Sequence, residues 1–287
     1  MKKELNNQIS LADSIDKGYY EIYDIKRGGL ANCRDLGGMT TSLGKRIKSR
    51  RLLRSGKLCK LNKKEVQTLK DAGVKTVIDL RIENEVAGHP DTKIDGIKYH
   101  HVPLICYTLP GITREKSMFR VMKDESALLK KQYADRNEYM KNLYDKIVFS
   151  HDTQKQIRRV LEIILNAKGC VLWHCAGGKD RAGIISMLVE GLLGVSDEDI
   201  VKDYIASQQA QKLKKAMQKF GLTVCAIFSF NYKFKDILFA MLDAKAEYIS
   251  HVLNGINDKY GSIENYCIEA LKISPDLIIS FRQSVLD

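Results

Sequence analysis

The 287-residue sequence is poor in proline, with only four residues of this type, and it has no stretch rich in serine, glycine and proline. Low-complexity tracts and repeats of fixed period are also absent, which excludes solenoids and small modules joined by flexible linkers. Hydrophobic residues make up 44% of the chain, enough for a full core at this length. We therefore predict one domain covering residues 1–287.

Long apolar segments are missing as well. The N-terminus, MKKELNNQISLADS, carries charge with no apolar core behind it, so it does not resemble a secretory signal. No apolar run approaches the roughly 20 residues that a membrane-spanning helix requires. These features predict a cytoplasmic protein without a membrane span, and they leave export by a signal-independent route open.

The seven cysteines include no C-x-x-C pair, and their number is odd. This pattern argues against a zinc ribbon and against a disulfide framework, and it favours a reducing compartment. Most of these cysteines are expected to be small buried apolar residues. We expect no metal and no other cofactor.

Acidic residues are in the minority, because 35 Asp and Glu stand against 47 Lys and Arg, which gives a net charge of +12. A charge of this sign attracts phosphorylated molecules, nucleic acid and acidic lipid surfaces. The lysines are spread along the chain, however, so the charge alone favours solvated helix faces. We predict no nucleic-acid partner.

Short β-rich runs alternate with helical patterns. Residues 75–81, KTVIDLR, and 97–104, IKYHHVPL, predict strands, and residues 62–72 predict a helix capped by Asn62. Residues 170–174, CVLWH, are a continuous apolar run typical of a buried strand. This alternation predicts an α/β fold in which a central sheet is flanked by helices.

The segment after this last strand holds the residues that point to chemistry. A loop, CAGGKDRAG, begins at Cys175 and leads into an apolar helical pattern over residues 184–194. A loop between a strand and a helix N-terminus gathers backbone N–H groups beside the positive end of the helix, and this arrangement binds anions. Glycines at 177, 178 and 183 allow the backbone to approach a phosphate closely.

Two known phosphate loops do not fit this segment. The nucleotide P-loop requires Ser or Thr after its Gly-Lys pair, and here Gly178 and Lys179 precede Asp180. The position where that motif begins with glycine is occupied by Trp173. The dinucleotide G-x-G-x-x-G pattern is also absent.

The remaining feature is a cysteine with an arginine six positions later. Arg181 can fold back over the loop and hold two phosphoryl oxygens through its planar guanidinium. The N–H dipoles that hold phosphate also stabilise a thiolate at Cys175. A thiolate beneath a phosphate is placed for in-line attack, which produces a phosphocysteine that water then hydrolyses.

Residues 174–181, HCAGGKDR, resemble the H-C-x5-R signature of protein tyrosine phosphatases, and the G-K-D-R ending is similar to an atypical bacterial group of tyrosine and phosphoinositide phosphatases. Further segments are similar to elements of that group and occur in the same order. They are NCRDLGG at 32–38, LRSG at 53–56, VIDLR at 77–81 followed by Glu85, and YGS at 260–262. The resemblance covers nearly the whole chain and implies a phosphatase-like α/β fold.

The resemblance also implies a role for each position. Cys175 would be the nucleophile, Arg181 would bind phosphate, and His174 would orient the loop and keep the cysteine ionised. The implied phosphate-binding residues are Ala176, Gly177, Gly178 and Lys179.

The general acid is implied less directly. The only tryptophan is Trp173, so the W-P-D loop that carries the acid in many tyrosine phosphatases is absent. The resemblance places the acid within the loop, at Asp180, which would protonate the leaving oxygen; a helix cap is the alternative role. Asp79 and Asp35 are the reserve candidates. For Arg34 and Asp35, contact with substrate and a buried structural ion pair both remain open.

One position departs from the family pattern, because Ala182 stands where Thr or Ser usually follows the arginine. That hydroxyl would stabilise the thiolate that leaves when phosphocysteine is hydrolysed, and the loss of one such donor costs roughly 10²-fold. We therefore expect the second chemical step to be slow.

The predicted function is hydrolysis of phosphomonoesters, on phosphotyrosine in proteins and also on phosphoserine, phosphothreonine and phosphoinositides. The predicted partners are phosphorylated proteins or phosphoinositides, with a phosphate or other oxyanion bound in the active site. Ala182 favours the alternative of a phosphate-binding module with weak turnover. A rhodanese-like sulfurtransferase, which also carries a cysteine loop at a helix start, is a further alternative.

The rest of the sequence is mostly helical in pattern. Residues 107–148 predict a helical insertion, which either covers the active site as a lid or packs permanently on the body. Residues 196–287 predict a helical C-terminal part. The aromatic run at 228–234, FSFNYKF, is expected to pack in the core, with contact to a lipid or protein partner as the alternative.

Overall fold

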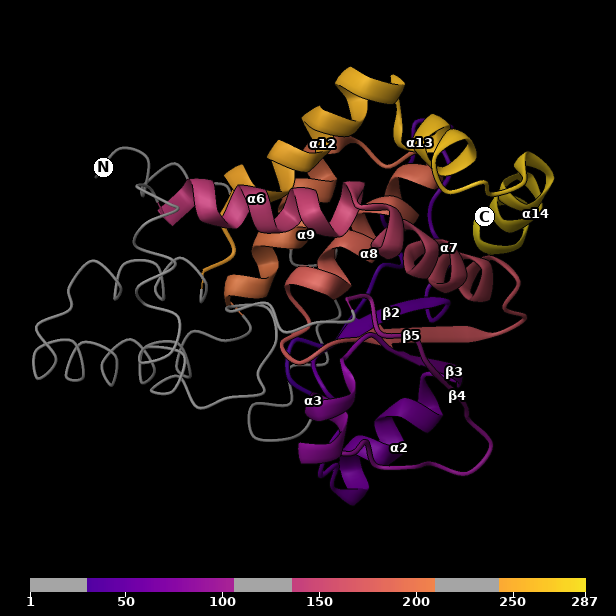
Figure 1. Ribbon diagram of the computed structural model, residues 1–287. Coiled ribbons are helices and arrows are strands. Elements are labelled where there is room, and N and C mark those ends of the chain that lie inside the picture. The colour runs from indigo at the N-terminus through magenta and orange to yellow at the C-terminus, as the bar shows by residue number, and fades with distance from the viewer. Residues whose placement is uncertain (1–29, 106–135, 210–242) are drawn as a thin grey trace, which may run out of the picture.

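The computed structural model describes residues 30–105, 136–209 and 243–287 (Figure 1). Within these ranges a five-stranded sheet has the order β1-β2-β5-β3-β4, with β1 antiparallel to β2 and all other neighbours parallel. The strands are β1 (Arg34–Asp35), β2 (Leu52–Ser55), β3 (Val74–Asp79), β4 (Lys98–His101) and β5 (Cys170–His174). The predicted central sheet flanked by helices is confirmed.

Helices cover both faces of the sheet. Figure 1 shows α2 (Lys63–Asp71) and α3 (Glu83–Gly88) on one side, with the larger helical layer on the other. That layer contains α6 (Arg136–Phe149), α7 (His151–Leu165), α8 (Asp180–Leu192), α9 (Asp197–Gln209), α12 (Ala246–Tyr260), α13 (Ile263–Glu269) and α14 (Pro275–Val285). None of the helices described is long and apolar enough to cross a membrane.

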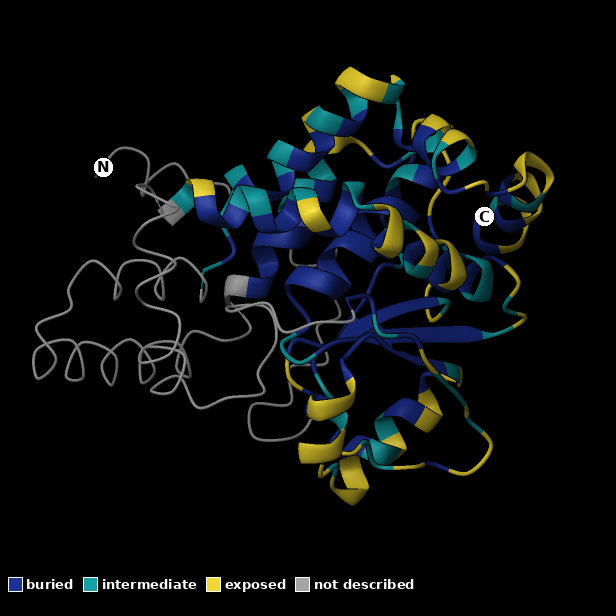
Figure 2. Cartoon of the chain, in the orientation of Figure 1, coloured by how far each residue is buried: buried dark blue, intermediate teal, exposed yellow. Residues whose placement is uncertain are grey.

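The central strand β5 belongs to both hydrophobic cores. Val171 and Trp173 pack in the large core beneath α7 and α8, whereas Leu172 packs in the smaller core beneath α2. Alternate residues of a strand point to opposite faces, so a strand between two helical layers must be apolar at every position. This explains the continuous apolar run CVLWH, which Figure 2 shows as buried along its length.

Helix α8 is buried along nearly its whole length, because it lies against the sheet and is covered by its helical neighbours. The apolar pattern predicted its helix from residue 184, but the helix begins at Asp180. The first turn of α8 consists of polar and small residues, so hydrophobic periodicity does not predict that this turn is helical. The candidate site therefore lies on the helix itself as well as on the loop before it.

The YGS segment near the end of the chain joins two helices. Gly261 ends α12 in the left-handed conformation, with φ of +79°, and the Ser262 hydroxyl accepts a hydrogen bond from the Asn265 N–H at the start of α13. The segment thus combines a C-cap and an N-cap in consecutive residues. The predicted Asn62 cap of α2 is confirmed, and Glu65 completes its capping box.

The helical insertion predicted at 107–148 is described only from residue 136, where α6 begins. The remainder of it, and the aromatic run at 228–234, lie outside the described residues. From residue 196 onward, the described chain consists mainly of α9, α12, α13 and α14.

Candidate active site

The loop of interest connects the carboxyl end of β5 to the N-terminus of α8. Its first residue, Cys175, is 3% exposed and follows directly on the buried strand. Gly178 has φ of +67°, and a Cβ atom there would lie 2.6 Å from the Ser55 carbonyl carbon. This glycine allows the loop to pack directly on the end of β2.

The carbonyl groups of the loop are bound from outside. The Asn32 Nδ2 donates to Gly177 O at 3.1 Å and to Gly178 O at 2.8 Å. The Arg54 Nη2 donates to Gly178 O at 2.9 Å and to Lys179 O at 3.2 Å. Because C=O and N–H point in opposite directions within a planar trans peptide, these contacts turn the following N–H groups toward the interior of the loop.

A buried ion-pair cluster holds these two donors. Asp203 of α9 pairs with Arg54 through Oδ2 and with the Arg34 Nε through Oδ1, at 2.7 Å in the second case. The Arg34 Nη1 in turn donates to Asn32 Oδ1 at 2.6 Å. Burial would raise the pKa of Asp203, but the two guanidinium groups lower it below the ordinary value. Arg34 thus forms a buried ion pair, and its partner is Asp203.

Arg181 lies in the first turn of α8, and its guanidinium is held by Glu85 of α3. The Nη1 atom lies 2.6 Å from Glu85 Oε2 and the Nη2 atom lies 2.9 Å from Oε1, a bidentate contact, while Leu80 O is 3.3 Å from Nη1. Burial would lower the pKa of Arg181, but the hydrogen bonds with Glu85 raise it. The pair fixes the plane of the guanidinium beside the loop.

Cys175 interacts electrostatically with two of these cations, Arg54 and Arg181. Both guanidinium groups are almost fully buried, so solvent screens their charges only weakly. Two buried positive charges therefore act on the sulfur atom of Cys175.

Asp180 occupies the first position of α8, and its carboxylate is contacted by α6 directly and by α9 through a second tyrosine. The Tyr144 hydroxyl of α6 donates to Asp180 Oδ1 at 2.6 Å, and the Tyr204 hydroxyl of α9 lies 2.6 Å from that of Tyr144. The Lys179 Nζ lies 3.2 Å from the same Oδ1 and donates to Asp243 O at 3.0 Å. The carboxyl and ammonium groups of Asp180 and Lys179 are thus neighbours at the mouth of the loop.

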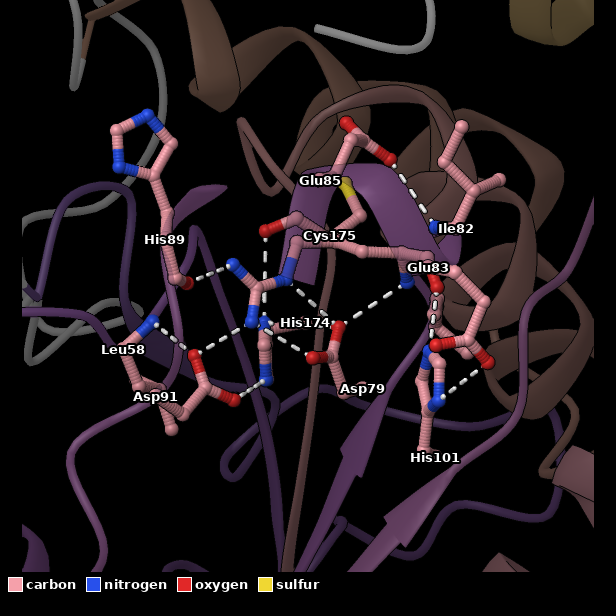
Figure 3. Close-up of polar contacts among 12 residues, drawn as sticks. Leu58, Asp79, Ile82, Glu83, Glu85, His89, Asp91, His101, His174 and Cys175 are labelled. Carbon is pink, nitrogen blue, oxygen red and sulfur yellow. Dashed lines mark hydrogen bonds and ion pairs between the residues drawn. The ribbon is translucent and has the colours of Figure 1, made fainter. Parts of the chain in front are cut away.

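His174 and Asp79 belong to a polar cluster at the base of the loop (Figure 3). The His174 Nε2 lies 2.8 Å from Asp91 Oδ2, and its Nδ1 lies 3.4 Å from Cys175 O. Arg81 donates to Asp79 Oδ2 at 2.7 Å and to Asp91 Oδ1 at 2.8 Å, so its guanidinium bridges both carboxylates. Burial would raise the pKa of Asp79, but His174 and Arg81 lower it.

This cluster also brings metal-ligating atoms of Asp79, Asp91 and His174 within 4.8 Å of one another. Arg81 already neutralises both carboxylates from a buried position, so the cluster is built as an ion-pair network. Among the described residues, the Arg81 guanidinium therefore supplies the positive charge that a metal ion would otherwise supply to Asp79 and Asp91.

Asp35 is directed away from the loop. Its carboxylate accepts hydrogen bonds from the backbone N–H groups of Gly37 and Arg50, at 2.9 and 2.5 Å, in the connection between β1 and β2. Its neighbour across the sheet is Leu53, which pairs with Leu172, three residues before Cys175. These contacts make Asp35 a turn-capping residue.

Several residues at the site were not predicted as site residues. Asn32, Arg54 and Glu85 lie within or beside the segments that resemble the family. Those segments were the feature of the sequence from which a role at the site could have been predicted. Tyr144 and Asp203 lie on helices whose amphipathic patterns gave no sign of a polar role. Only the tertiary structure brings these two residues to the loop.

The profile of the tyrosine phosphatase family matches residues 25–287, and thus covers the loop together with all the elements that hold it. The chain belongs to the tyrosine phosphatase family. Three proteins with tyrosine or triple specificity phosphatase in their names are similar to this chain.

A predicted tyrosine-protein phosphatase of Cupriavidus necator is 26% identical over 257 residues, covering 88% of this chain and 85% of that protein. The triple specificity protein phosphatase PtpB of Mycobacterium tuberculosis is 26% identical over 263 residues, covering 84% and 92%. A tyrosine-protein phosphatase of Nostoc commune is 30% identical over 158 residues, covering 54% of this chain and 47% of that protein. The similarity to the first two relatives thus extends over most of this chain and most of each relative.

Proposed function

We propose that this phosphatase hydrolyses phosphomonoesters through a phosphocysteine formed on Cys175. One observation carries the proposal: the cysteine begins a loop whose carbonyl groups are bound outward by Asn32 and Arg54, beside an Arg181 that Glu85 holds in place. Inward N–H groups and a fixed guanidinium are the donors that a phosphoryl group requires.

In the first step, the loop N–H groups and Arg181 bind the phosphoryl oxygens. The Cys175 thiolate attacks phosphorus, an S–P bond forms, and the P–O bond to the leaving group breaks. Asp180 supplies the proton that the leaving oxygen takes. Asp79 is a poorer donor, because Arg81 and His174 favour its ionised form, and Asp35 faces the turn at the far end of β2.

In the second step, a water molecule attacks phosphorus, and Asp180, now ionised, accepts its proton. The S–P bond breaks, phosphate leaves, and the Cys175 thiolate is restored. The side chain of Ala182 offers no hydroxyl to this thiolate, so this step limits turnover. The cycle needs no metal and no cofactor.

Phosphotyrosine in proteins is the proposed principal substrate, with phosphoserine, phosphothreonine and phosphoinositides as further substrates. The name of the PtpB relative, a triple specificity phosphatase, supports a broad range. The Lys179 ammonium beside the loop adds a positive charge that suits multiply phosphorylated molecules. The proposal also includes a single domain over residues 1–287. A cytoplasmic location is proposed as well, and the five free cysteines among the described residues support it, because free thiols are typical of a reducing compartment.

The test is a substrate panel of phosphotyrosine, phosphoserine and phosphothreonine peptides with phosphoinositides, assayed for phosphate release. We expect Cys175→Ser to lower the rate by about 10³-fold or more, and acid quenching of the wild type to trap one phosphoryl group on Cys175. The matched control is Cys59→Ser, which changes another nearly buried free cysteine and should follow the wild type. Tight phosphopeptide binding without turnover by the wild type would replace the proposal with a binding module.

A further inference from the structure

The carboxyl group of Asp180 is held by a pair of tyrosines that come from two separate helices. Tyr144 of α6 donates to Asp180 Oδ1 at 2.6 Å, and Tyr204 of α9 lies 2.6 Å from the Tyr144 oxygen. All three side chains are buried, and the two tyrosine rings meet edge to face with centroids 6.2 Å apart. A buried hydroxyl chain of this kind has a defined geometry and little competition from water.

The direction of this chain follows from counting protons. Tyr144 has one hydroxyl proton, and it is donated to Asp180. Tyr204 must therefore donate to Tyr144. Burial, and after it the charge of Asp180, raise the pKa of Tyr144 well above its ordinary value, so the hydroxyl keeps its proton.

The two oxygens of Asp180 differ in their surroundings. Tyr144 and the Lys179 Nζ both contact Oδ1, at 2.6 and 3.2 Å. Within the part of the chain that the structure describes, Oδ2 accepts no hydrogen bond. When the carboxyl is neutral, the anchored Oδ1 serves as the acceptor, and Oδ2 is the oxygen that carries the proton.

We propose that Tyr144 is a positioning residue, which fixes the rotation of the Asp180 carboxyl so that Oδ2 faces the leaving group. The torsion that orients an aspartate carboxyl has a broad energy profile, so a second contact is needed to select one orientation. Tyr144 supplies that contact, and Tyr204 fixes Tyr144. This inference rests on the proposed function, in which Asp180 is the general acid.

The test compares Tyr144→Phe with the wild type over a series of phosphate esters, from acidic phenols to simple alcohols as leaving groups. The value of kcat/KM reports cleavage of the P–O bond, so the slow second step does not mask it. An acidic phenol departs without a proton, whereas an alcohol needs one. We expect Tyr144→Phe to be within about twofold of the wild type for the best leaving group and about tenfold lower for the poorest.

The matched control is Tyr248→Phe. Its ring lies 6.1 Å from that of Tyr144, and its hydroxyl donates to Asn137 Oδ1 at 3.3 Å. Among the described residues, the hydrogen bond to the Asp180 side chain comes from Tyr144 and not from Tyr248. It should keep the leaving-group dependence of the wild type.

Tyr204→Phe is a second test variant, which keeps the Tyr144 hydroxyl and removes only the hydroxyl that donates to it. It should make the loss of kcat/KM for poor leaving groups larger than in the wild type, as Tyr144→Phe does, but by a smaller factor.

Two outcomes would overturn the inference, and they can be told apart. An equal loss for all leaving groups in Tyr144→Phe, or an unchanged slope in Tyr204→Phe if Tyr144→Phe does not fold, would assign the tyrosines a structural role only. Asp180→Asn serves as the reference, and we expect its dependence to be the steepest. A wild-type slope in Asp180→Asn would instead show that the acid assignment in the proposed function is wrong.

Discussion

Glu85 holds the guanidinium of Arg181 through two short contacts. Both carboxylate oxygens are used on the two Nη atoms, and both side chains are buried. Such bidentate, charge-assisted contacts add orientation as well as energy. Under the proposed function, we expect a phosphoryl group to meet an arginine that is already oriented, so that little of the binding energy is needed to order the side chain.

We expect Glu85→Gln to weaken competitive inhibition by orthophosphate by about tenfold, which corresponds to ~1.4 kcal/mol. The amide keeps the shape of the side chain but loses the charge and one acceptor oxygen. Glu83→Gln is the control, because Glu83 lies on the same helix with a side chain that is 81% exposed. Equal inhibition constants for Glu85→Gln and the wild type would contradict a role for Glu85 in holding Arg181.

Under the proposed mechanism, we expect Ala182 to determine whether the reaction begins with a burst. With an aryl phosphate in stopped flow, the wild type should release about one phenol per active site in a burst before slow turnover, because the second step lacks a hydroxyl donor. Ala182→Ser should raise the steady-state rate by about tenfold and reduce the burst. Ala270→Ser, at the end of α13, is the control. A linear onset with fast turnover in the wild type would contradict the expectation.

The spacing of Cys175 and Arg181 could be predicted because both residues lie in one short segment. Glu85 holds Arg181 from 96 positions away, and Asp203 holds Arg34 from 169 positions away. Contacts between residues so far apart in the chain cannot be predicted from local sequence patterns. The buried partners of the loop were therefore accessible only through the resemblance or through the folded chain.

At the scale of the elements, two glycines separate a conformational role from a steric one: Gly44 in the connection between β1 and β2, and Gly178 in the loop after β5. Gly44 and Gly178 both have positive φ, at +70° and +67°. A Cβ at Gly44 would have no neighbour within 4 Å, whereas a Cβ at Gly178 would meet Gly56 and Ser55 at 2.6 Å. The two positions thus form a matched pair that differs only in the approach of the backbone.

We expect Gly44→Ala to cost about 1–2 kcal/mol of stability through backbone strain and to leave kcat/KM unchanged. Gly178→Ala carries the same strain, and it must also push the loop away from β2. Its kcat/KM should fall by about 10²-fold, because the N–H groups lose their positions. Denaturant unfolding and initial rates measure the two effects, and equal activity in the two variants would show that the close approach is unimportant.

Three of the five strands could be predicted, and the reason is their composition. Strands β3 and β5 are rich in β-branched and apolar residues, and β4 ends at a proline-containing segment. Strands β1 and β2 have two and four residues, and each contains a buried arginine. Short strands with buried charges have no alternating pattern, so the sequence of β1 and β2 indicates a family motif but not a strand.

At the scale of the whole molecule, the buried charges make stability depend on pH. Glu190 of α8 is fully buried beside Asp203, and burial, followed by the charge of Asp203, raises its pKa well above the ordinary value of 4.5. Asp203 shifts in the opposite direction, because Arg34 and Arg54 outweigh its burial. The two carboxyl groups therefore act on stability in separate pH ranges.

A carboxyl that binds its proton more tightly in the folded state contributes stability below its unfolded pKa, and this contribution is lost as the pH rises toward the folded pKa. Glu190 should therefore lower the free energy of unfolding as the pH rises above about 4.5. Glu190→Gln removes this titration while keeping a buried hydrogen-bonding group of the same shape. Its stability should exceed that of the wild type increasingly toward neutral pH.

Urea unfolding between pH 5 and 8 measures this difference, and Glu269→Gln, an exposed change on α13, is the control. Parallel stability curves for Glu190→Gln and the wild type would contradict the expected protonation of Glu190. Asp203 and Asp79 both have a lowered pKa in the folded chain, so both contribute to the loss of stability below the ordinary Asp pKa of 3.8, and this loss should be retained in Glu190→Gln.

The fold class could be predicted as a whole because strands alternated with helical patterns in the part of the chain that builds the sheet. The sheet order could not, since β5 enters between β2 and β3 although it follows both in sequence. That crossover brings the loop to the centre of the molecule, between the arginines of β1 and β2 and the carboxylate of α3.

The ion pair between Arg54 and Asp203 has a consequence for how the protein is made. Synthesis proceeds from the N-terminus, so Asn32, Arg54 and the loop leave the ribosome before Asp203 does. We therefore expect that, until α9 follows, Arg34 and Arg54 lack the carboxylate that neutralises them in the folded chain, and that the loop is not yet held in its final form. The active site around Cys175 is therefore expected to be inactive in the nascent chain. The ability to remove phosphate from other molecules should arise only after synthesis has passed well beyond residues 174–181.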